Sequence, residues 1–361
     1  SIQAVETDQV TGACQALLFD NQIVEMAVEC ISPSNCGAAT YQVNTVPVPT
    51  PVSTNTQSTV NSYSDVTLDF GNAASSTATF TQTYDEAGSI RLWARYQLLD
   101  SGGAATGNTI TGSSNSFVNR PAGFCMESPD ANWQCSTPAL DAGCTAFKQA
   151  GDNFNLSVTA KRYSVGSTDY CSHGTTNNFT NSVNLSHSLI SPTAIDGGQA
   201  GNFSLSSVNL NSGVGTSALA NFDDMGVFSL SAGGNTYLTV ALPRNDSENI
   251  GRFYPKRFSI TTSTAATYDN GNTGFTYTGQ LESDGTTGSI SYLTAPDFTF
   301  EVQGYNNQTL NNYLTPLYST PVVSASASST TQGNVPSAMT LTAGWSAGSI
   351  SGPDINDRYT Y

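Results

Sequence analysis

Two segments of the chain share one eleven-residue pattern. Residues 222–232 (FDDMGVFSLSA) align without a gap to residues 84–94 (YDEAGSIRLWA). Each copy has an aromatic residue, two acids, one further residue, a glycine, and then apolar residues at every second position. A glycine tolerates backbone conformations that strain other residues, and alternation with a period of two buries one face of a strand. An acidic turn with a glycine that leads into such a strand is one way into a late strand of an immunoglobulin-like β-sandwich. The duplication therefore predicts two sandwiches in series.

The rest of the chain favours the same fold class. At 361 residues it is long enough for two or three domains, and its hydrophobic content of 38% allows buried cores. Stretches of Thr, Ser, Val, Tyr and Phe are broken throughout by Gly, Asn and Asp, as is typical of strands and turns. We therefore predict an all-β protein of tandem immunoglobulin-like β-sandwiches.

The charge balance excludes some classes of partner. Lys and Arg number 11 against 27 acids, which gives a net charge of −16. Binding of nucleic acid or of anionic lipid surfaces depends on clustered Lys and Arg, so neither is expected. No apolar run approaches the length of a bilayer span and no signal peptide opens the sequence. We therefore expect no membrane insertion, and a mature form or an excised piece of a secreted protein.

The seven cysteines predict disulfides rather than a metal site. None forms a CxxC pair, and His173 and His187 are poorly placed to complete a zinc set. Disulfides place the chain outside the reducing cytosol. Cys30 and Cys36 could close a small loop around Pro33, and the four cysteines of the later group could pair among themselves. The odd count leaves one thiol over, or one partner outside this sequence. The candidates are Cys14, Cys30 and Cys36, and then Cys125, Cys135, Cys144 and Cys171.

The pattern along the chain predicts four segments. They are a sandwich at residues 1–118, a cysteine-stapled insert at 119–149, a sandwich at 150–249 and a third sandwich at 250–361. In the first unit we expect strands at 24–30, 39–46, 66–70, 77–83 and 89–98, an exposed edge or loop at the proline-rich 46–51, and a loop or linker at 102–114. In the insert we expect few strands and a short helix at 140–149. In the second unit we expect strands at 154–160, 183–189, 203–210, 227–231 and 237–242.

A second internal repeat marks the third unit. Residues 298–304 match the spacing of residues 154–160, and Asn311-Asn312-Tyr313 follows as Asn177-Asn178-Phe179 does earlier. The third unit has no acidic turn and glycine of its own further on. It is therefore permuted, cut short, or completed by a strand from another chain.

Several motifs together resemble a known family. Residues 117–125 (FVNRPAGFC), 151–160, 250–258 (IGRFYPKRF) and 275–280 (FTYTGQ) occur in that order, after the Cys14, Cys30, Cys36 pattern. In this they look like the MshQ-like proteins of mannose-sensitive haemagglutinin type IV pilus loci. The resemblance implies a large secreted protein of Gram-negative bacteria, associated with pili and suspected of adhesion. Such proteins often carry a lectin-like domain upstream and continue past the equivalent of Tyr361, and both features are absent here.

The acids and histidines offer little catalytic chemistry. Hydrolases need a base beside a nucleophile, or two carboxylates at a set distance, and both histidines lie in Asn- and Ser-rich segments where we expect surface polar residues. Acid pairs occur at Asp85-Glu86, Asp223-Asp224 and Asp354/Asp357. We expect solvated turn carboxylates there, with calcium bridging of loops as the alternative. Asn270-Gly271 favours a hairpin turn over a calcium loop.

One basic cluster and three tryptophans are the other candidate contact residues. Arg252, Lys256 and Arg257 are expected to pair with acids where the second and third sandwiches meet, or else to dock an acidic neighbour. Trp93 is at an outward position of its strand, and we expect it to cover a domain junction or bind a ligand. Trp133 and Trp345 could stack on sugar rings.

These observations favour a protein that presents a surface, not an enzyme. We expect an extracellular, pilus-associated structural or adhesive module at the bacterial cell surface, without a cofactor other than the calcium alternative. Its expected partners are pilus proteins or copies of itself, with a glycan or other cell-surface ligand as a further choice. The rival functions are a fibre subunit that exchanges strands between chains, a carbohydrate-binding module and, as the weakest, a secreted hydrolase.

Overall fold

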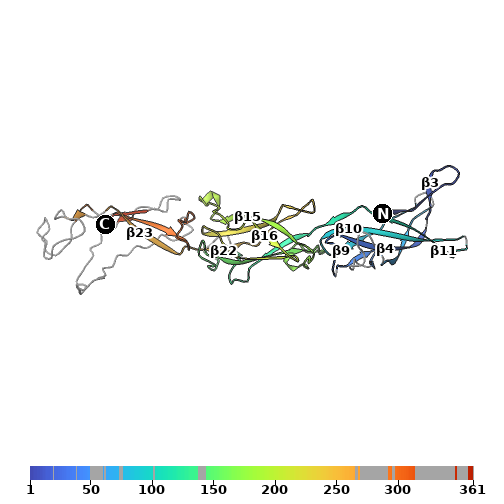
Figure 1. Cartoon of the computed structure of the whole chain (residues 1–361). Coiled ribbons are helices and arrows are strands. Elements are labelled where there is room, and N and C mark those ends of the chain that lie inside the picture. Colours follow the sequence, from blue (N-terminus) through green and yellow to red (C-terminus); the bar gives the residue numbers. More distant parts are fainter. Residues whose placement is uncertain are drawn as a thin grey trace.

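The chain is all-β, as predicted, and its strands form three units that lie in a row (Figure 1). In the described residues the helical pieces are two short 3-10 turns, Tyr170–Ser172 and Ala194–Asp196. No helix of this part of the chain is long and apolar enough to cross a membrane. The computed structural model describes residues 1–18, 20–37, 39–48, 60, 62–72, 76–100, 102–136, 144–264, 267–268, 292–294, 297–313, 346–347 and 357–360.

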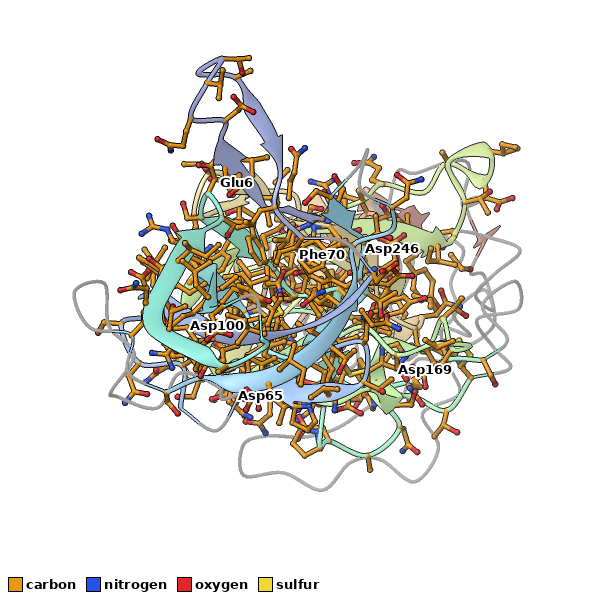
Figure 2. The ribbon with its side chains drawn as sticks, turned by 90° about the vertical axis from the view of Figure 1, so that its right-hand side faces the viewer. Glu6, Asp65, Phe70, Asp100, Asp169 and Asp246 are labelled. Carbon is orange, nitrogen blue, oxygen red and sulfur yellow. A yellow bond between two sulfur atoms is a disulfide. The ribbon has the colours of Figure 1, made fainter. Side chains whose placement is uncertain are left out.

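The first unit is a sandwich of two layers. One layer has the strand order β11-β10-β4-β7, with β12 also beside β10, and the other contains the sheet β6-β5-β9 and the pair β1-β8. The two layers bury one apolar core, with Phe70 between them (Figure 2). A hairpin of β2 and β3 extends from β1. The strands are β1 (Ile2–Gln3), β2 (Val5–Thr7), β3 (Cys14–Ala16), β4 (Asn21–Ser32), β5 (Tyr41–Val43), β6 (Val46–Val48), β7 (Ser64–Asp69), β8 (Thr77–Ala78), β9 (Gln82–Tyr84), β10 (Gly88–Leu99), β11 (Ala105–Ser113) and β12 (Phe117–Asn119).

The second unit repeats this plan. One sheet has the order β16-β15-β18-β21, with β22 also beside β18, and it faces the sheet β13-β14-β17. Phe222 and Phe228 stack in the core with ring centroids 4.2 Å apart. The strands are β13 (Gly123–Glu127), β14 (Phe154–Lys161), β15 (Asn181–Ser191), β16 (Ser207–Leu210), β17 (Val214–Ala220), β18 (Gly226–Gly233), β19 (Thr236–Tyr237), β20 (Val240–Ala241), β21 (Arg244–Asp246) and β22 (Ile250–Phe253).

The third unit is described in part. Its strands form the sheet β23-β26-β28-β27 and the pair β24-β25. The division predicted between residues 249 and 250 falls between β21 and β22, and both of these strands pair with β18 of the second unit. The strands are β23 (Arg257–Thr264), β24 (Thr267–Tyr268), β25 (Tyr292–Thr294), β26 (Asp297–Gln303), β27 (Ser346–Ala347) and β28 (Asp357–Thr360).

The duplicated segments occupy equivalent places. β10 pairs with β4 as β18 pairs with β15, and in both pairs one residue of the partner strand, Ile31 of β4 or Ile190 of β15, is skipped near the start of β10 or β18. Ile90 lies opposite Cys30 after the skip, and Phe228 lies opposite Leu189. The duplication seen in the sequence is therefore a duplication of structure.

Many predicted strands are confirmed, but several predictions are wrong, and residues 39–46 and 77–83 each contain parts of two short strands instead of one strand. Residues 105–113 form strand β11 instead of a loop. This edge strand pairs with β10 through its backbone and leaves nearly all its side chains exposed, so it needs no apolar alternation. Residues 237–242 form the hairpin β19-β20 instead of one strand, because Leu238 and Thr239 adopt positive φ. Strands were predicted correctly within residues 24–30, 66–70, 89–98, 154–160, 183–189 and 227–231, and β6 is an edge strand as expected for residues 46–48.

The segment 119–149 also differs from its prediction. It contains β13, which belongs to a sheet of the second unit. Residues 144–149 are not helical, because the backbone of Phe147 and Lys148 bonds to the backbone of Arg252 and Tyr254. Three disulfides are present, Cys30–Cys36, Cys125–Cys171 and Cys135–Cys144, and Cys14 lies in β3.

Candidate functional site: the joints between the units

The acid of the first duplicated turn is buried where the first unit meets the second. Glu86 is 7% exposed. One of its carboxylate oxygens, Oε2, accepts a hydrogen bond from the backbone N–H of Asn178 at 3.0 Å, and Oε1 accepts one from the side chain of Asn177 at 3.4 Å. The side chain of Asn178 donates in turn to the backbone carbonyl of Cys36 at 2.8 Å. We call this set of contacts joint 1.

The residue after the acid extends across joint 1. Ala87 is fully buried and belongs to the apolar core of the second unit, although it precedes β10 of the first. Gly88 follows at φ +153°, and a Cβ atom there would lie 2.6 Å from the carbonyl oxygen of Ser32. Only glycine fits this position without displacement of the backbone.

The second duplicated turn makes the equivalent contacts with the third unit. Asp224 is 2% exposed, and its carboxylate accepts hydrogen bonds from the backbone N–H groups of Asn311 at 3.1 Å and Asn312 at 3.2 Å. The side chain of Asn311 donates to it as well. The side chain of Asn312 donates to the carbonyl groups of Gln199 at 2.8 Å and Met225 at 2.9 Å. We call this set of contacts joint 2.

Apolar packing at joint 2 also matches joint 1. Met225, in the place of Ala87, is fully buried against Val302 and Leu310 of the third unit and Ala150 of the second. Gly226 has φ +132°, and a Cβ atom there would lie 2.4 Å from the carbonyl oxygen of Ser191. Both joints therefore combine a buried acid, a pair of asparagines, one inserted apolar side chain and an obligatory glycine.

The first acid of each turn holds its own unit together. The carboxylate of Asp85 accepts the backbone N–H of Thr40 at 2.7 Å, and that of Asp223 accepts the N–H of Asn202 at 2.6 Å. Asp85 also forms an ion pair with Arg162 of the second unit at 3.0 Å. In each turn the first acid therefore binds a loop of its own unit, and the residues directly after it contact the next unit.

Gln308 of the third unit adds contacts at joint 2. Its side-chain amide donates to the carbonyl oxygens of Ala150 and Asp223, both at 3.0 Å. These contacts bring residues 150 and 223 of the second unit together with residue 308 of the third.

Burial changes the ionisation of groups at the joints. Burial raises the pKa of the Asp224 carboxyl above its ordinary value, and the N–H donors around it oppose that rise only in part. Burial, and then the charge of Glu86, raise the pKa of Tyr84 and of Tyr237 on either side of joint 1.

The expectation of solvated acids is therefore wrong for Glu86 and Asp224, which accept several hydrogen bonds out of water. The expectation of surface histidines is wrong for His173, which is 6% exposed with Nδ1 at 3.0 Å from the carbonyl oxygen of Arg162. The ring of His187 packs near Phe222 at 5.6 Å. Asp354, Trp345 and the turn at residues 269–272 lie outside the described residues, and Asp357 begins β28.

The other candidate residues have structural contacts. Lys256 donates to the carbonyl of Tyr305 at 2.9 Å and Arg257 to the side chain of Gln303 at 3.1 Å, so their contacts with other described residues are with neutral groups. The indole N–H of Trp93 donates to the carboxylate of Glu29 at 2.7 Å within the first unit, and Trp133 packs against the core of the second. Arg252 lies in β22.

Metal ligands do not gather at the joints in the described part of the chain. The group of close Cys and carboxylate atoms found there is Cys125, Glu127 and Cys171, and its two sulfurs are bonded to each other. A cluster of three or more carboxylates that could hold calcium is therefore not found among the described residues.

The pairing of acids with asparagines was missed from the sequence, although both motifs were recognised as repeats. The distance along the chain between the two motifs was the signal that could have revealed the pairing. Glu86 and Asn178 are 92 residues apart, and Asp224 and Asn312 are 88 apart. An interval of about one domain between two repeated motifs indicates contact between successive domains.

Comparison with known proteins matches this three-part organisation. Residues 1–113 match the model of a domain of unknown function, DUF6701, described as its first Ig-like domain. Residues 120–220 match the second domain of DUF6701 and residues 224–361 its third. Neither a curated protein nor a solved structure matches the chain. Because three consecutive models of one family account for nearly the whole chain in order, the protein belongs to the DUF6701 family.

Proposed function

We propose that the protein is an extracellular structural module that holds a binding surface at a distance from the bacterial cell, and that it catalyses no reaction. The observation that carries this proposal is the repetition of the joint. Two successive contacts use the same buried acid, asparagine pair and inserted apolar side chain.

A buried acid that accepts hydrogen bonds from the next unit fixes the relative orientation of the two units. Domains in one chain move relative to each other by default unless their interface is extensive or specific. Opening joint 1 or joint 2 breaks the hydrogen bonds to the buried carboxylate, and hydrogen bonds to a charged group contribute about 1.5–3 kcal/mol each. The units therefore behave as a stiff row, which suits a spacer.

The compartment is part of the same proposal. Three disulfides favour an oxidising environment. The resemblance to MshQ-like proteins adds an association with type IV pili and a role in adhesion. A sugar-binding function has less support, because Trp93 and Trp133 are engaged in contacts within the units.

The spacer function is tested by small-angle X-ray scattering of the whole chain. The double variant Glu86→Ala/Asp224→Ala removes both acids, and Glu6→Ala/Asp65→Ala removes two exposed acids of the first unit (Figure 2). We expect a broader distribution of shapes for the first variant and no change for the second. Equal flexibility of both variants and the unchanged chain would overturn the proposal.

A further inference from the structure

One of the three disulfides has a member on the surface. Cys171 is exposed, whereas its partner Cys125 is buried. The cysteines of the other two disulfides are all buried: Cys30, Cys36, Cys135 and Cys144. Thiol–disulfide exchange begins when a thiolate attacks one sulfur of the bond, so its rate depends on access to that sulfur. Cys125–Cys171 is therefore the bond that a thiol in solution reaches most readily.

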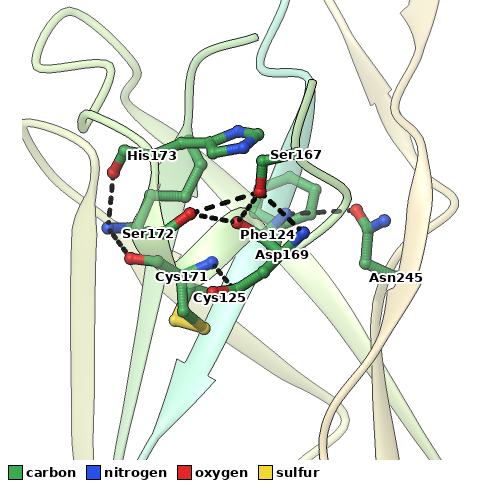
Figure 3. The surroundings of a disulfide bond; sticks show 9 residues. Phe124, Cys125, Ser167, Asp169, Cys171, Ser172, His173 and Asn245 are labelled. Atoms are coloured by element: carbon green, nitrogen blue, oxygen red, sulfur yellow. Dashed lines mark hydrogen bonds between the residues drawn. A yellow bond between two sulfur atoms is a disulfide. The ribbon is translucent and has the colours of Figure 1, made fainter. Parts of the chain in front are cut away.

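The exposed cysteine lies in a loop that rests on strand β13. Residues 162–176 form this loop between β14 and Asn177, and the 3-10 turn Tyr170–Ser172 is part of it. The carboxylate of Asp169 accepts the backbone N–H of Cys171 at 2.9 Å beside the disulfide (Figure 3). The ring of Tyr170 packs on Gly123 of β13, where an added Cβ atom would lie 2.6 Å from it. The disulfide to Cys125 is therefore the covalent attachment of this loop to β13.

Polar contacts connect the 3-10 turn to Arg162. Nζ of Lys161 donates to the carbonyl oxygens of Cys171 at 3.4 Å and His173 at 3.1 Å. His173 is buried, and its Nδ1 lies 3.0 Å from the carbonyl oxygen of Arg162. The backbone N–H of Arg162 donates to the carbonyl of Gly174 at 2.9 Å. A displacement of the turn therefore disturbs the position of Arg162.

The same loop leads to the contacts that the second unit makes at joint 1. Arg162 forms the ion pair with Asp85 at 3.0 Å. The loop ends at Asn177 and Asn178, which donate to the carboxylate of Glu86. These contacts across joint 1 therefore depend on how the loop is held.

Joint 2 has no counterpart of this loop. In the third unit, residues 304–310 connect β26 to Asn311, and they are fewer and contain no cysteine. The side chain of Gln308 in this shorter connection bonds directly to the carbonyl oxygens of Ala150 and Asp223 in the second unit. A change in the state of Cys125–Cys171 therefore acts at joint 1 and not at joint 2.

We propose that Cys125–Cys171 is a site of thiol exchange, and that its reduction by a dithiol loosens joint 1 and leaves joint 2 closed. A thiolate of the dithiol attacks the sulfur of Cys171, the S–S bond breaks, and the sulfur of Cys125 leaves with the electron pair and takes a proton from water. The second thiol of the reductant, once deprotonated, attacks its own sulfur in the mixed disulfide and releases Cys171, which is protonated in turn. The dithiol is oxidised to a disulfide, and its two electrons reduce the bond in the protein. This inference rests on the proposed function, because it makes the stiffness of the row adjustable at one joint.

Glu127 slows this exchange. One of its carboxylate oxygens and the two sulfurs all lie within 4.8 Å of one another. Both the attacking thiolate and the departing sulfur of Cys125 are negative, so the carboxylate repels the charge on either side of the reaction. Removal of this charge should therefore speed reduction.

The first test identifies the bond that opens. Free thiols of the whole chain are blocked with iodoacetamide, dithiothreitol is added at increasing concentration, and the new thiols are labelled with N-ethylmaleimide for peptide mass spectrometry. We expect Cys125 and Cys171 to be labelled before the other four disulfide cysteines. Glu127→Gln should speed their labelling about twofold to fourfold, whereas Asp65→Asn, which removes an exposed acid of β7, should leave the rate unchanged. Earlier labelling of either buried disulfide would overturn the proposal.

The second test measures both joints by hydrogen exchange. Because the carbonyl of Cys36 also lies at joint 1, exchange is compared at a concentration of dithiothreitol that leaves Cys30–Cys36 intact. The amides around Asn178 should exchange about tenfold faster after reduction, and those around Asn312 should not change. Cys125→Ser/Cys171→Ser should show the same pattern without reductant, and the reduced unchanged chain decides the question if that variant does not fold.

The outcomes separate this inference from the spacer function. Unchanged protection around Asn178 after reduction, in a chain that scattering shows to be stiff when oxidised, would overturn the inference alone. Equal loosening of both joints would also overturn it, because the effect would then not pass through the loop at residues 162–176. A chain that is already flexible when oxidised would overturn the spacer function and this inference together.

Discussion

The carboxylate of Glu86 in the first unit lies 3.0 Å from the backbone nitrogen of Asn178 in the second. Asp224 lies 3.2 Å from the backbone nitrogen of Asn312 in the same way. The two contacts join different units but use the same atoms of the same motifs. The same turn therefore lies at the end of one sandwich and forms the contact site for the next.

Replacement of Glu86 by alanine should destabilise the chain. The change removes the hydrogen bond between the buried carboxylate and the half-buried N–H of Asn178, at a cost of about 1–3 kcal/mol in the free energy of unfolding. Urea unfolding followed by tryptophan fluorescence measures this cost. Asp65→Ala removes an exposed acid of β7 and should change the free energy by less than about 0.5 kcal/mol. Equal effects of the two changes would show that the joint contributes nothing.

The duplicated glycines should tolerate no side chain. Gly88→Ala and Gly226→Ala each bring a Cβ atom within 2.6 Å of a backbone carbonyl at positive φ, so each should cost about 1–3 kcal/mol. Gly112→Ala is the matched control, because nothing lies within 4 Å of its added Cβ atom. Thermal unfolding of the three variants provides the comparison. A control as unstable as the other two would contradict the assignment.

The sequence was sufficient for the features that depend on local pattern. Alternation identified the inward face of β14, and the glycine that opens β10 and β18 was found from the repeat alone. It was not sufficient for contacts between distant segments. Glu86 and Asp224 lie in turns whose composition is typical of exposed turns. Their carboxylates can be buried because they accept hydrogen bonds from residues about 90 positions away. β11 was missed for a related reason, since an edge strand held by its backbone carries no apolar alternation.

Joint 2 should respond to acid through Asp224. Its pKa in the folded chain is raised above the ordinary value of 3.8, so the folded state binds a proton more readily than the unfolded state. This group therefore favours folding below about pH 4, and its contribution is lost as the pH rises through the raised value. The difference in unfolding free energy between the unchanged chain and Asp224→Asn should thus decrease from pH 4 upward and then become constant. Urea unfolding at a series of pH values measures it. A difference that grows with pH would contradict the sign.

The disulfides should differ in what they contribute. Cys125 and Cys171 are 46 residues apart, whereas Cys30 and Cys36 are 6 apart. If a cross-link acts mainly by restricting the unfolded chain, its effect grows with the loop it closes, to about 4 kcal/mol for the longer loop and about 2 kcal/mol for the shorter. Cys125→Ala/Cys171→Ala should therefore lower the free energy of unfolding by more than Cys30→Ala/Cys36→Ala does. Urea unfolding under non-reducing conditions compares them. Cys30, Cys36 and Cys125 are buried whereas Cys171 is exposed, so a larger loss from the shorter loop would show that packed sulfur or local order around Pro33 matters more than chain entropy.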